Sequence, residues 1–115
     1  MPEVDFACQR FTIDKIVTCS FGITETDYAV LLYLFGHDDK TVHEIAKALG
    51  KERSTIQKSI NKLFEKNLIE RRQKNISEGG YKFIYSAKDK EAVKEKISSV
   101  VDNWVLNVKR EIKRW

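Results

Sequence analysis

The clearest hydrophobic pattern in the chain lies between positions 41 and 50. Apolar residues recur there at the i, i+3, i+4 and i+7 spacing of one helix face, and they are Val42, Ile45, Ala46 and Leu49. Thr41 and Glu44 have the spacing of a capping box, which marks the start of a helix. Gly50 can adopt the left-handed conformation that ends one. The pattern predicts a short amphipathic helix between Thr41 and Gly50.

A second helical stripe follows after a tight turn, and it consists of Ile56, Ser59, Ile60 and Leu63. Rotation by about 100° per residue places the polar residues Ser54, Lys58, Asn61 and Lys62 on the opposite face. The cations of this face can approach phosphates, and its small polar groups can approach base edges. The helix therefore suits a DNA major groove. The alternative is an ordinary solvated helix face.

The residues after this helix predict a β-hairpin. Asn67 can supply the left-handed residue that closes the helix, and Leu68 and Ile69 anchor a strand that runs through Gln73. Residues 75–80 have turn chemistry, and residues 81–86 alternate between aromatic and other side chains. The flanks of the hairpin are basic and carry Arg71, Arg72, Lys74 and Lys82.

Two further helices are expected before this region. Residues 4–19 are read as helical, although the spacing of their apolar residues Phe6, Ile13, Ile16 and Val17 is irregular. Thr24 and Asp27 repeat the capping-box spacing, and a full helical stripe follows at Tyr28, Leu31, Leu32 and Phe35. A helix is therefore expected from Thr24 to about Phe35.

The C-terminal segment 88–115 predicts one long helix with a heptad-like seam. The seam consists of Val93, Ile97, Val101, Trp104, Val108, Ile112 and Trp115. Two exposed tryptophans are costly in water, so the seam needs a partner, and the simplest partner is the same helix of a second chain. The expected dimer interface is Phe6, Ile13, Val17, Ile97, Val101, Trp104, Val108, Ile112 and Trp115. The alternative is that the helix folds back over its own domain, which would bury about the first half of the seam.

Charge is distributed unevenly and supports the DNA-binding interpretation. Residues 51–74 carry eight Lys or Arg against three acids, whereas residues 1–50 carry four against eight. The positive charge thus coincides with the expected groove-facing surface. The 115 residues fit one domain without a separate ligand-binding domain.

The order helix, helix-turn-helix, β-hairpin resembles a winged helix-turn-helix. Roughly residues 20–87 resemble the MarR-type and TrmB-type transcriptional regulators. The sequence motifs that carry the resemblance are Leu49-Gly50, Arg53-Ser54-Thr55-Ile56 and the run from Leu63 to Ile69. The flanking helices resemble the dimerisation helices of small archaeal members. The fold expected is mainly α with a small β-hairpin wing. It divides into an N-terminal helix (1–21), a DNA-binding domain (22–87) and a dimerisation helix (88–115).

The resemblance implies a homodimer that binds specific sequences of double-stranded DNA. Arg53, Ser54 and Thr55 would begin the recognition helix, about 53–66, while Gln57, Lys58, Asn61 and Lys62 would enter the major groove. Arg71, Arg72, Lys74 and Lys82 would form the wing, about 70–85, on the backbone or minor groove. Glu52 departs from the families' usual Ser, Pro or Thr, and its charge would repel a phosphate. An effector, if one exists, would bind at the dimer interface, as phenolic compounds do in MarR-type proteins.

Other chemistry is absent from the sequence. There is no nucleophile–base pair or phosphate-binding glycine loop, so neither an enzyme nor a cofactor is expected. His37 and His43 flank two aspartates but do not have metal-site spacing. Cys8 and Cys19 are interpreted as core thiols, with a redox role for Cys8 left open. No membrane segment or secretory signal is recognised, so a cytoplasmic location is expected.

Two alternatives to a specific regulator stay open. A winged helix can serve as a protein-interaction module, although such a helix more often exposes Leu, Phe or Tyr. A basic dimer can also coat chromatin without sequence preference. Binding of RNA or single strands is disfavoured because the sequence reveals no exposed aromatic platform.

Overall fold

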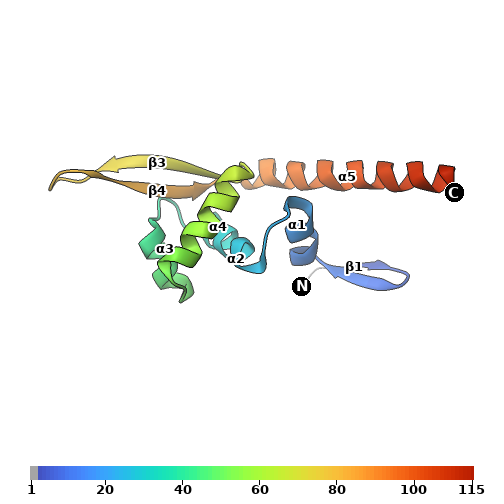
Figure 1. Cartoon of the computed structure of the whole chain (residues 1–115), viewed down its shortest axis with the longest axis horizontal. Helices are drawn as coiled ribbons and strands as arrows, with labels where there is room; N and C mark the ends of the chain where they lie inside the picture. The colour runs from blue at the N-terminus through green and yellow to red at the C-terminus, as the bar shows by residue number, and fades with distance from the viewer. Residues whose placement is uncertain (1–2) are drawn as a thin grey trace. The chain divides into compact units, whose positions relative to one another are not determined.

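The computed structural model describes residues 3–115. The elements are β1 (Glu3–Phe6), β2 (Gln9–Thr12), α1 (Ile13–Phe21), α2 (Glu25–Gly36), α3 (Val42–Leu49), α4 (Arg53–Glu65), β3 (Ile69–Asn75), β4 (Tyr81–Ala87) and α5 (Lys90–Arg114) (Figure 1). They form two compact units. One comprises residues 23–88, and the other comprises the terminal segments up to Gly22 and from Asp89 onward.

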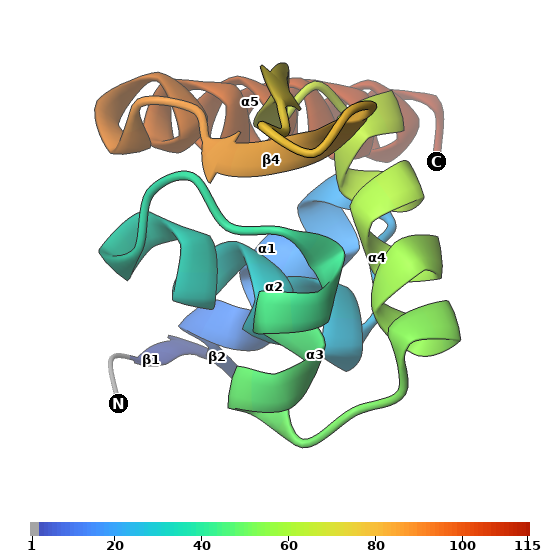
Figure 2. The same cartoon turned by 90° about the vertical axis from the view of Figure 1, so that its left-hand side faces the viewer.

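The unit of residues 23–88 is a winged helix-turn-helix built around three packed helices. Helices α2, α3 and α4 contact one another, and α2 and α4 also contact the β3–β4 hairpin (Figure 2). Its fully buried side chains are Val30, Leu31, Leu34, Ile45, Ile56, Ile60, Leu63, Leu68 and Ile69. They include Ile45 from the first predicted helical stripe and Ile56, Ile60 and Leu63 from the second. The winged helix-turn-helix predicted for this region is therefore confirmed.

Local signals set the ends of these helices as the sequence predicted. The capping boxes of Thr24 with Asp27 and of Thr41 with Glu44 are both present. Gly50 ends α3 with a φ of 64°, and Asn67 follows α4 with a φ of 60°. Both residues tolerate this left-handed conformation, Gly because it lacks a Cβ atom.

The hairpin that forms the wing is antiparallel, from Ile69 opposite Ala87 to Asn75 opposite Tyr81. Strand β3 ends at Asn75, two residues beyond Gln73, where the sequence predicted its end. Lys40 is bridged to Tyr85 by two backbone hydrogen bonds of 3.0 and 2.8 Å between their amides and carbonyls. The wing is therefore tied at its base to the segment between α2 and α3.

The predicted helix over residues 4–19 is wrong in its first half, which forms the β1–β2 hairpin; only α1 is helical. Polar and apolar residues alternate along β1. Val4 pairs with Phe11 on one face, while Asp5 pairs with Arg10 on the other. Arg10 Nε lies 2.6 Å from Asp5 Oδ1 and 3.1 Å from Glu3 Oε2. A period of two, with cross-strand charge pairs, favours strands over a helix.

Helix α1 packs against the long helix α5 in the terminal unit. Val17 and Val93 are buried, with 6% and 3% of their surfaces exposed, and Ile97 is half-buried. Val17, expected at the dimer interface, therefore belongs to the core of its own chain. The remainder of the α5 seam, from Val101 to Trp115, is exposed.

None of the helices in the described part of the chain combines the length and apolar character needed to cross a membrane. The described residues also contain no cluster of three or more His, Cys, Asp or Glu side chains that could hold a metal ion.

Candidate nucleic-acid interface

Helix α4 presents one polar face to solvent because its other face is buried. Ile56, Ser59, Ile60 and Leu63 all have 2% or less of their surface exposed. The residues predicted to face DNA lie on the other side. They are Arg53, Ser54, Thr55, Gln57, Lys58 and Asn61, all exposed, and Lys62, which is half-buried. The structure therefore brings together the helix residues that the sequence singled out.

The two amide side chains of this face hold each other. Gln57 Nε2 donates a hydrogen bond of 2.9 Å to Asn61 Oδ1, one helical turn further on. This bond uses the carbonyl oxygen of Asn61 and leaves its amide hydrogens, together with the carbonyl oxygen of Gln57, to face outward. The pair thus offers a donor and an acceptor in a fixed relation, as recognition of a base edge requires.

The turn between α3 and α4 adds two cations that the sequence analysis did not single out. A shallow hollow of about 470 Å³ is lined there by His43, Ala46, Lys47, Lys51, Glu52, Arg53 and Ser54. Lys51 was counted in the basic segment but given no role. The fold brings Lys47 of α3 beside the start of α4, where an anion also meets the positive end of the helix dipole.

Glu52 occupies the N-cap position of α4 but does not cap it. Its backbone is extended, with φ −73° and ψ 151°, and its side chain accepts no capping hydrogen bond from the described helix. The exposed carboxylate therefore stands among the cations of this hollow. Its charge favours the helix N-terminus but opposes a phosphate.

The wing presents two chemically different faces because side chains alternate along a strand. On the first face lie Arg72, Lys74, Lys82 and Ile84, and on the second lie Arg71, Tyr81 and Phe83. The sequence alone predicts a single role for the four wing cations, Arg71, Arg72, Lys74 and Lys82. The structure separates them into three different environments.

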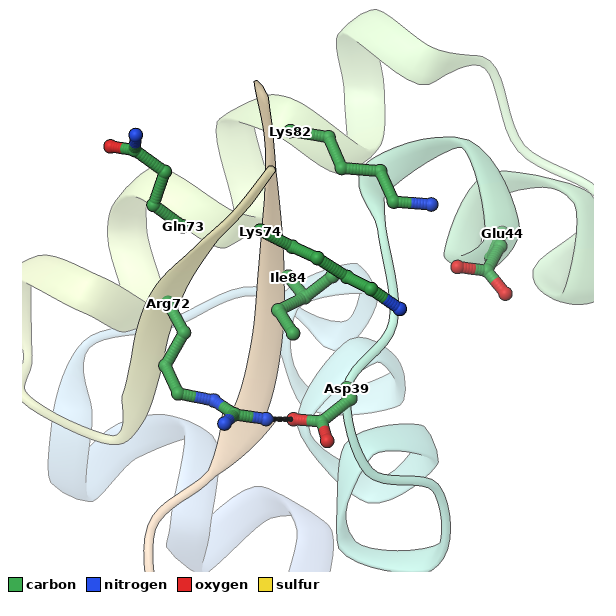
Figure 3. A pocket seen from close by; sticks show the side chains of 7 residues that line it. All are labelled: Asp39, Glu44, Arg72, Gln73, Lys74, Lys82 and Ile84. Atoms are coloured by element: carbon green, nitrogen blue, oxygen red, sulfur yellow. Dashed lines mark ion pairs between the residues drawn. The ribbon is translucent and has the colours of Figure 1, made fainter. Parts of the chain in front are cut away.

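Arg72 is held at the base of the wing by an acid from another part of the chain. Its Nη2 atom lies 2.7 Å from Asp39 Oδ1, and Ser86 Oγ donates a hydrogen bond of 3.0 Å to the same carboxylate oxygen (Figure 3). These two partners, Arg72 first, lower the pKa of Asp39 below its ordinary value, and Asp39 raises the pKa of Arg72 in return. Arg72 is charged but engaged.

Lys74 and Lys82 lie directly opposite each other on this first face. They line a hollow of about 400 Å³ together with Asp39, Glu44, Arg72, Gln73 and Ile84. Figure 3 shows both ammonium groups on the side of Asp39 and Glu44, whereas Gln73 points away. The pKa of Glu44 is lowered, mainly by the backbone amide of Thr41 and to a smaller extent by Lys40 and Lys82. Like charges directly opposite in a sheet repel, and an anion placed between the two lysines would relieve this repulsion.

Arg71 is exposed on the second face and contacts two aromatic rings there. Its guanidinium carbon lies 4.4 Å from the centre of the Phe83 ring and 5.2 Å from that of Phe64 on α4. Tyr81 meets Phe83 edge to face, with ring centres 5.4 Å apart. Arg71 thus joins the wing to α4, and the contact with DNA expected for it from sequence stays a prediction. Tyr81 on the wing and Phe64 at the end of α4 are 55% and 46% exposed, so this side of the domain does carry exposed aromatic surface.

Comparison with known proteins places this arrangement in a family. The family model described as "Sugar-specific transcriptional regulator TrmB" matches residues 18–91. The chain belongs to the TrmB family. The match covers the whole winged helix-turn-helix and the beginning of α5, so the resemblance to TrmB-type regulators is confirmed.

Individual relatives of this TrmB-family protein are archaeal. An uncharacterized protein of Methanocaldococcus jannaschii is 31% identical over 90% of this chain and 78% of its own length. A second uncharacterized protein of that organism is 34% identical over 89% of this chain and 84% of its own. A solved structure, a possible transcriptional regulator from Methanosarcina mazei, has a TM-score of 0.90 at 30% identity and covers 99% of this chain and 97% of that one.

The fold is shared with a protein solved on DNA. The Staphylococcus aureus MepR–DNA complex has a TM-score of 0.56 at 23% identity, covering 85% of this chain and 82% of that one. At this identity the likeness concerns the fold alone. The winged-helix architecture of the TrmB-family chain is therefore the one used by a DNA-bound protein.

Proposed function

We propose that this TrmB-family protein is a homodimeric transcriptional regulator that binds specific sequences of double-stranded DNA. The observation that carries the proposal is the polar face of α4. Its exposed cations and its Gln57–Asn61 pair stand opposite a fully buried apolar stripe. A helix held this way can enter the major groove with its amides toward the bases.

Phosphate contacts would come from cations on both sides of this helix. Lys47 and Lys51 lie at its start, and Lys74 and Lys82 lie on the wing. Each cation that neutralises a phosphate releases counterions, so the affinity should fall steeply with salt. Arg72 would contribute less than these lysines because Asp39 already pairs with it.

The exposed half of α5 would be buried against a second chain in the dimer. Trp104, Ile112 and Trp115 have 62%, 61% and 104% of their surfaces exposed. Large apolar side chains clustered on one face mark an interaction site. A second copy related by a twofold axis would cover both faces and could present two recognition helices about 34 Å apart, to successive major grooves of a pseudo-palindrome.

The deciding experiment measures fluorescence anisotropy with a random duplex and with a pool of selected sequences, from about 50 to 300 mM salt. A specific regulator binds selected sequences much more tightly, and the logarithm of its affinity falls linearly with that of salt. Equal affinity for both pools would favour sequence-independent coating of DNA. Absence of binding at low salt would overturn DNA binding and leave a protein-interaction module.

The oligomeric part of the proposal has a separate test. Light scattering should give a dimer for the wild-type protein and a monomer for Trp104→Glu, because the charge would have to be buried in the interface between the two chains. A Trp104→Glu protein that stays dimeric would remove this face from the interface, whatever the result with DNA.

A further inference from the structure

The β1–β2 hairpin has an apolar face that the rest of its chain leaves in solvent. All four residues of β1 are exposed, and Val4 and Phe6 retain 59% and 68% of their surfaces. Val4 and Phe6 are two residues apart and share one face of β1, where Phe11 lies opposite Val4. Glu3, Asp5 and Arg10 form a charged face on the other side. The hairpin is therefore amphipathic, with its apolar side unoccupied.

The second uncovered apolar surface of this unit lies on the last three turns of α5. A hollow of about 470 Å³ runs along the helix and is lined by Trp104, Asn107, Val108, Glu111, Ile112 and Trp115. Both of the protein's tryptophans are found here. These turns also carry four cations against one acid, namely Lys109, Arg110, Lys113 and Arg114 against Glu111.

A hairpin of two short strands is only marginally stable by itself in water and needs something to pack on. Strand β2 contacts α1, but β1 stays exposed along its whole length. In Figure 1 the hairpin and the end of α5 project from α1 in the same direction. The two elements that carry uncovered apolar side chains thus extend from α1 in the same direction.

We propose that the apolar face of the β1–β2 hairpin docks on the last three turns of α5 of a second copy of this chain. The inference rests on the homodimer proposed above and names the segment that completes it. In a twofold dimer each hairpin would cover the partner's α5. The same contact would then form twice and bury the apolar faces of both hairpins and both helices. Any partner of another kind would have to supply two unrelated complementary surfaces.

Charge favours the same pairing. The outer face of the hairpin carries Glu3 and Asp5 against Arg10 and is therefore net acidic, whereas the end of α5 is basic. Opposite net charges on two docking segments speed their association by attraction over a distance. A contact between two hairpins would instead bring together two segments of the same net charge.

Cys8 is exposed in the turn between β1 and β2, and Cys19 is exposed on α1, so the interpretation of both as core thiols is wrong. The exposed Cys8 gives a direct test. One chain version carries Cys19→Ser, Trp104→Phe and Trp115→Phe, with a nitroxide on Cys8 that quenches tryptophan emission. The other carries Cys8→Ser and Cys19→Ser and keeps both tryptophans. After the two versions exchange subunits, with the labelled one in excess, we expect most of the tryptophan emission to be lost. Only docking between chains can produce this loss.

Two variants test whether the apolar face causes the contact. Phe6→Glu in the labelled chain should abolish the quenching and weaken the dimer by ~10-fold or more, because an apolar side chain buried in the interface is lost. Val4→Glu on the same face should act in the same direction. Both sites are exposed, so circular dichroism should show an unchanged fold. Tyr81→Glu is the matched control, an exposed aromatic on the other hairpin, and should leave dimerisation unchanged.

The remaining outcomes separate this inference from the proposed function. A wild-type dimer without quenching in the mixture overturns the hairpin contact and leaves the dimer standing. A third version of the chain carries the nitroxide on Cys8 and keeps both tryptophans. If quenching occurs in this version at high dilution but not in the mixture, the hairpin covers the α5 of its own chain, which also overturns the inference. A wild-type monomer overturns both the inference and the homodimer, while DNA binding is decided by anisotropy alone.

Discussion

Asp39 Oδ1 lies 2.7 Å from Arg72 Nη2 and joins the segment between α2 and α3 to the base of the wing. The side chains of both residues are exposed, so the pair adds little to stability. Its consequence is instead functional. In the proposed complex with DNA, Arg72 could contact a phosphate only if its ion pair with Asp39 opened.

Removal of the Asp39 charge should therefore strengthen DNA binding. Asp39→Asn keeps a residue that tolerates the positive φ of 56° at this site while weakening the hold on Arg72. We expect the slope of log affinity against log salt concentration (the salt slope) to steepen by ~0.9, the value for one additional phosphate contact. The matched control is Asp38→Asn, which removes the same charge beside it, where the described chain shows no ion pair. Equal slopes for the two variants would contradict the hold on Arg72.

The pair should also have a pH signature at the acid end. Because Arg72 and Ser86 lower the pKa of Asp39 below the ordinary 3.8, its contribution to stability is complete above that value. This contribution is lost as pH falls through the lowered pKa. The difference in urea midpoint between wild type and Asp39→Asn should stay constant from pH 7 to about pH 4 and disappear below. Glu44, whose pKa is also lowered, is present in both proteins and cancels.

Arg71 should behave differently from the wing lysines. Since its guanidinium lies between Phe64 and Phe83, Arg71→Met should lower stability by about 1 kcal/mol and leave the salt slope unchanged. Lys74→Ala should do the reverse, reducing the slope by ~0.9 with little effect on urea unfolding. A shallower slope for Arg71→Met would mean that Arg71 contacts phosphate after all.

Glu52→Ser should improve DNA binding without much change in stability. Serine at this N-cap would gain a capping hydrogen bond worth about 1 kcal/mol, and loss of the favourable charge at the helix N-terminus offsets about 0.3–1 kcal/mol of this. Removing an acid from among Lys47, Lys51 and Arg53 should raise the affinity several-fold. Glu65→Ser at the other end of α4 serves as the control in the same anisotropy titration. Equal gains from both variants would contradict a phosphate site at the helix start.

Gln57 and Asn61 should act as a unit in sequence recognition. Asn61→Ala should cost about 1–3 kcal/mol on a selected sequence and little on a random duplex. Because Gln57 donates to Asn61, the two alanine substitutions should be non-additive by at least about 0.5 kcal/mol in a double-mutant cycle. Strict additivity would show that each amide reads DNA independently.

Periodicity and capping, which depend on neighbours within a few positions, determined the helical part of the fold. The stripes at 42–49 and 56–63, the two capping boxes, and the left-handed Gly50 and Asn67 could all be read along the chain. The exposed cationic face of α4 follows from the same rule, since burying one side of a helix exposes the other. Residues 3–12 were misread because short strands offered too few positions to separate a period of two from an irregular helix.

The tertiary structure alone decided which cations are available to a ligand. Arg71 and Arg72 are adjacent and chemically identical, yet a strand turns them to opposite faces, one toward Phe64 and Phe83 and the other toward Asp39. Their partners come from α4, from β4 and from the segment after α2. Helix and turn signals act over four or five residues, whereas ion pairs and ring contacts depend on residues that only the folded chain brings together.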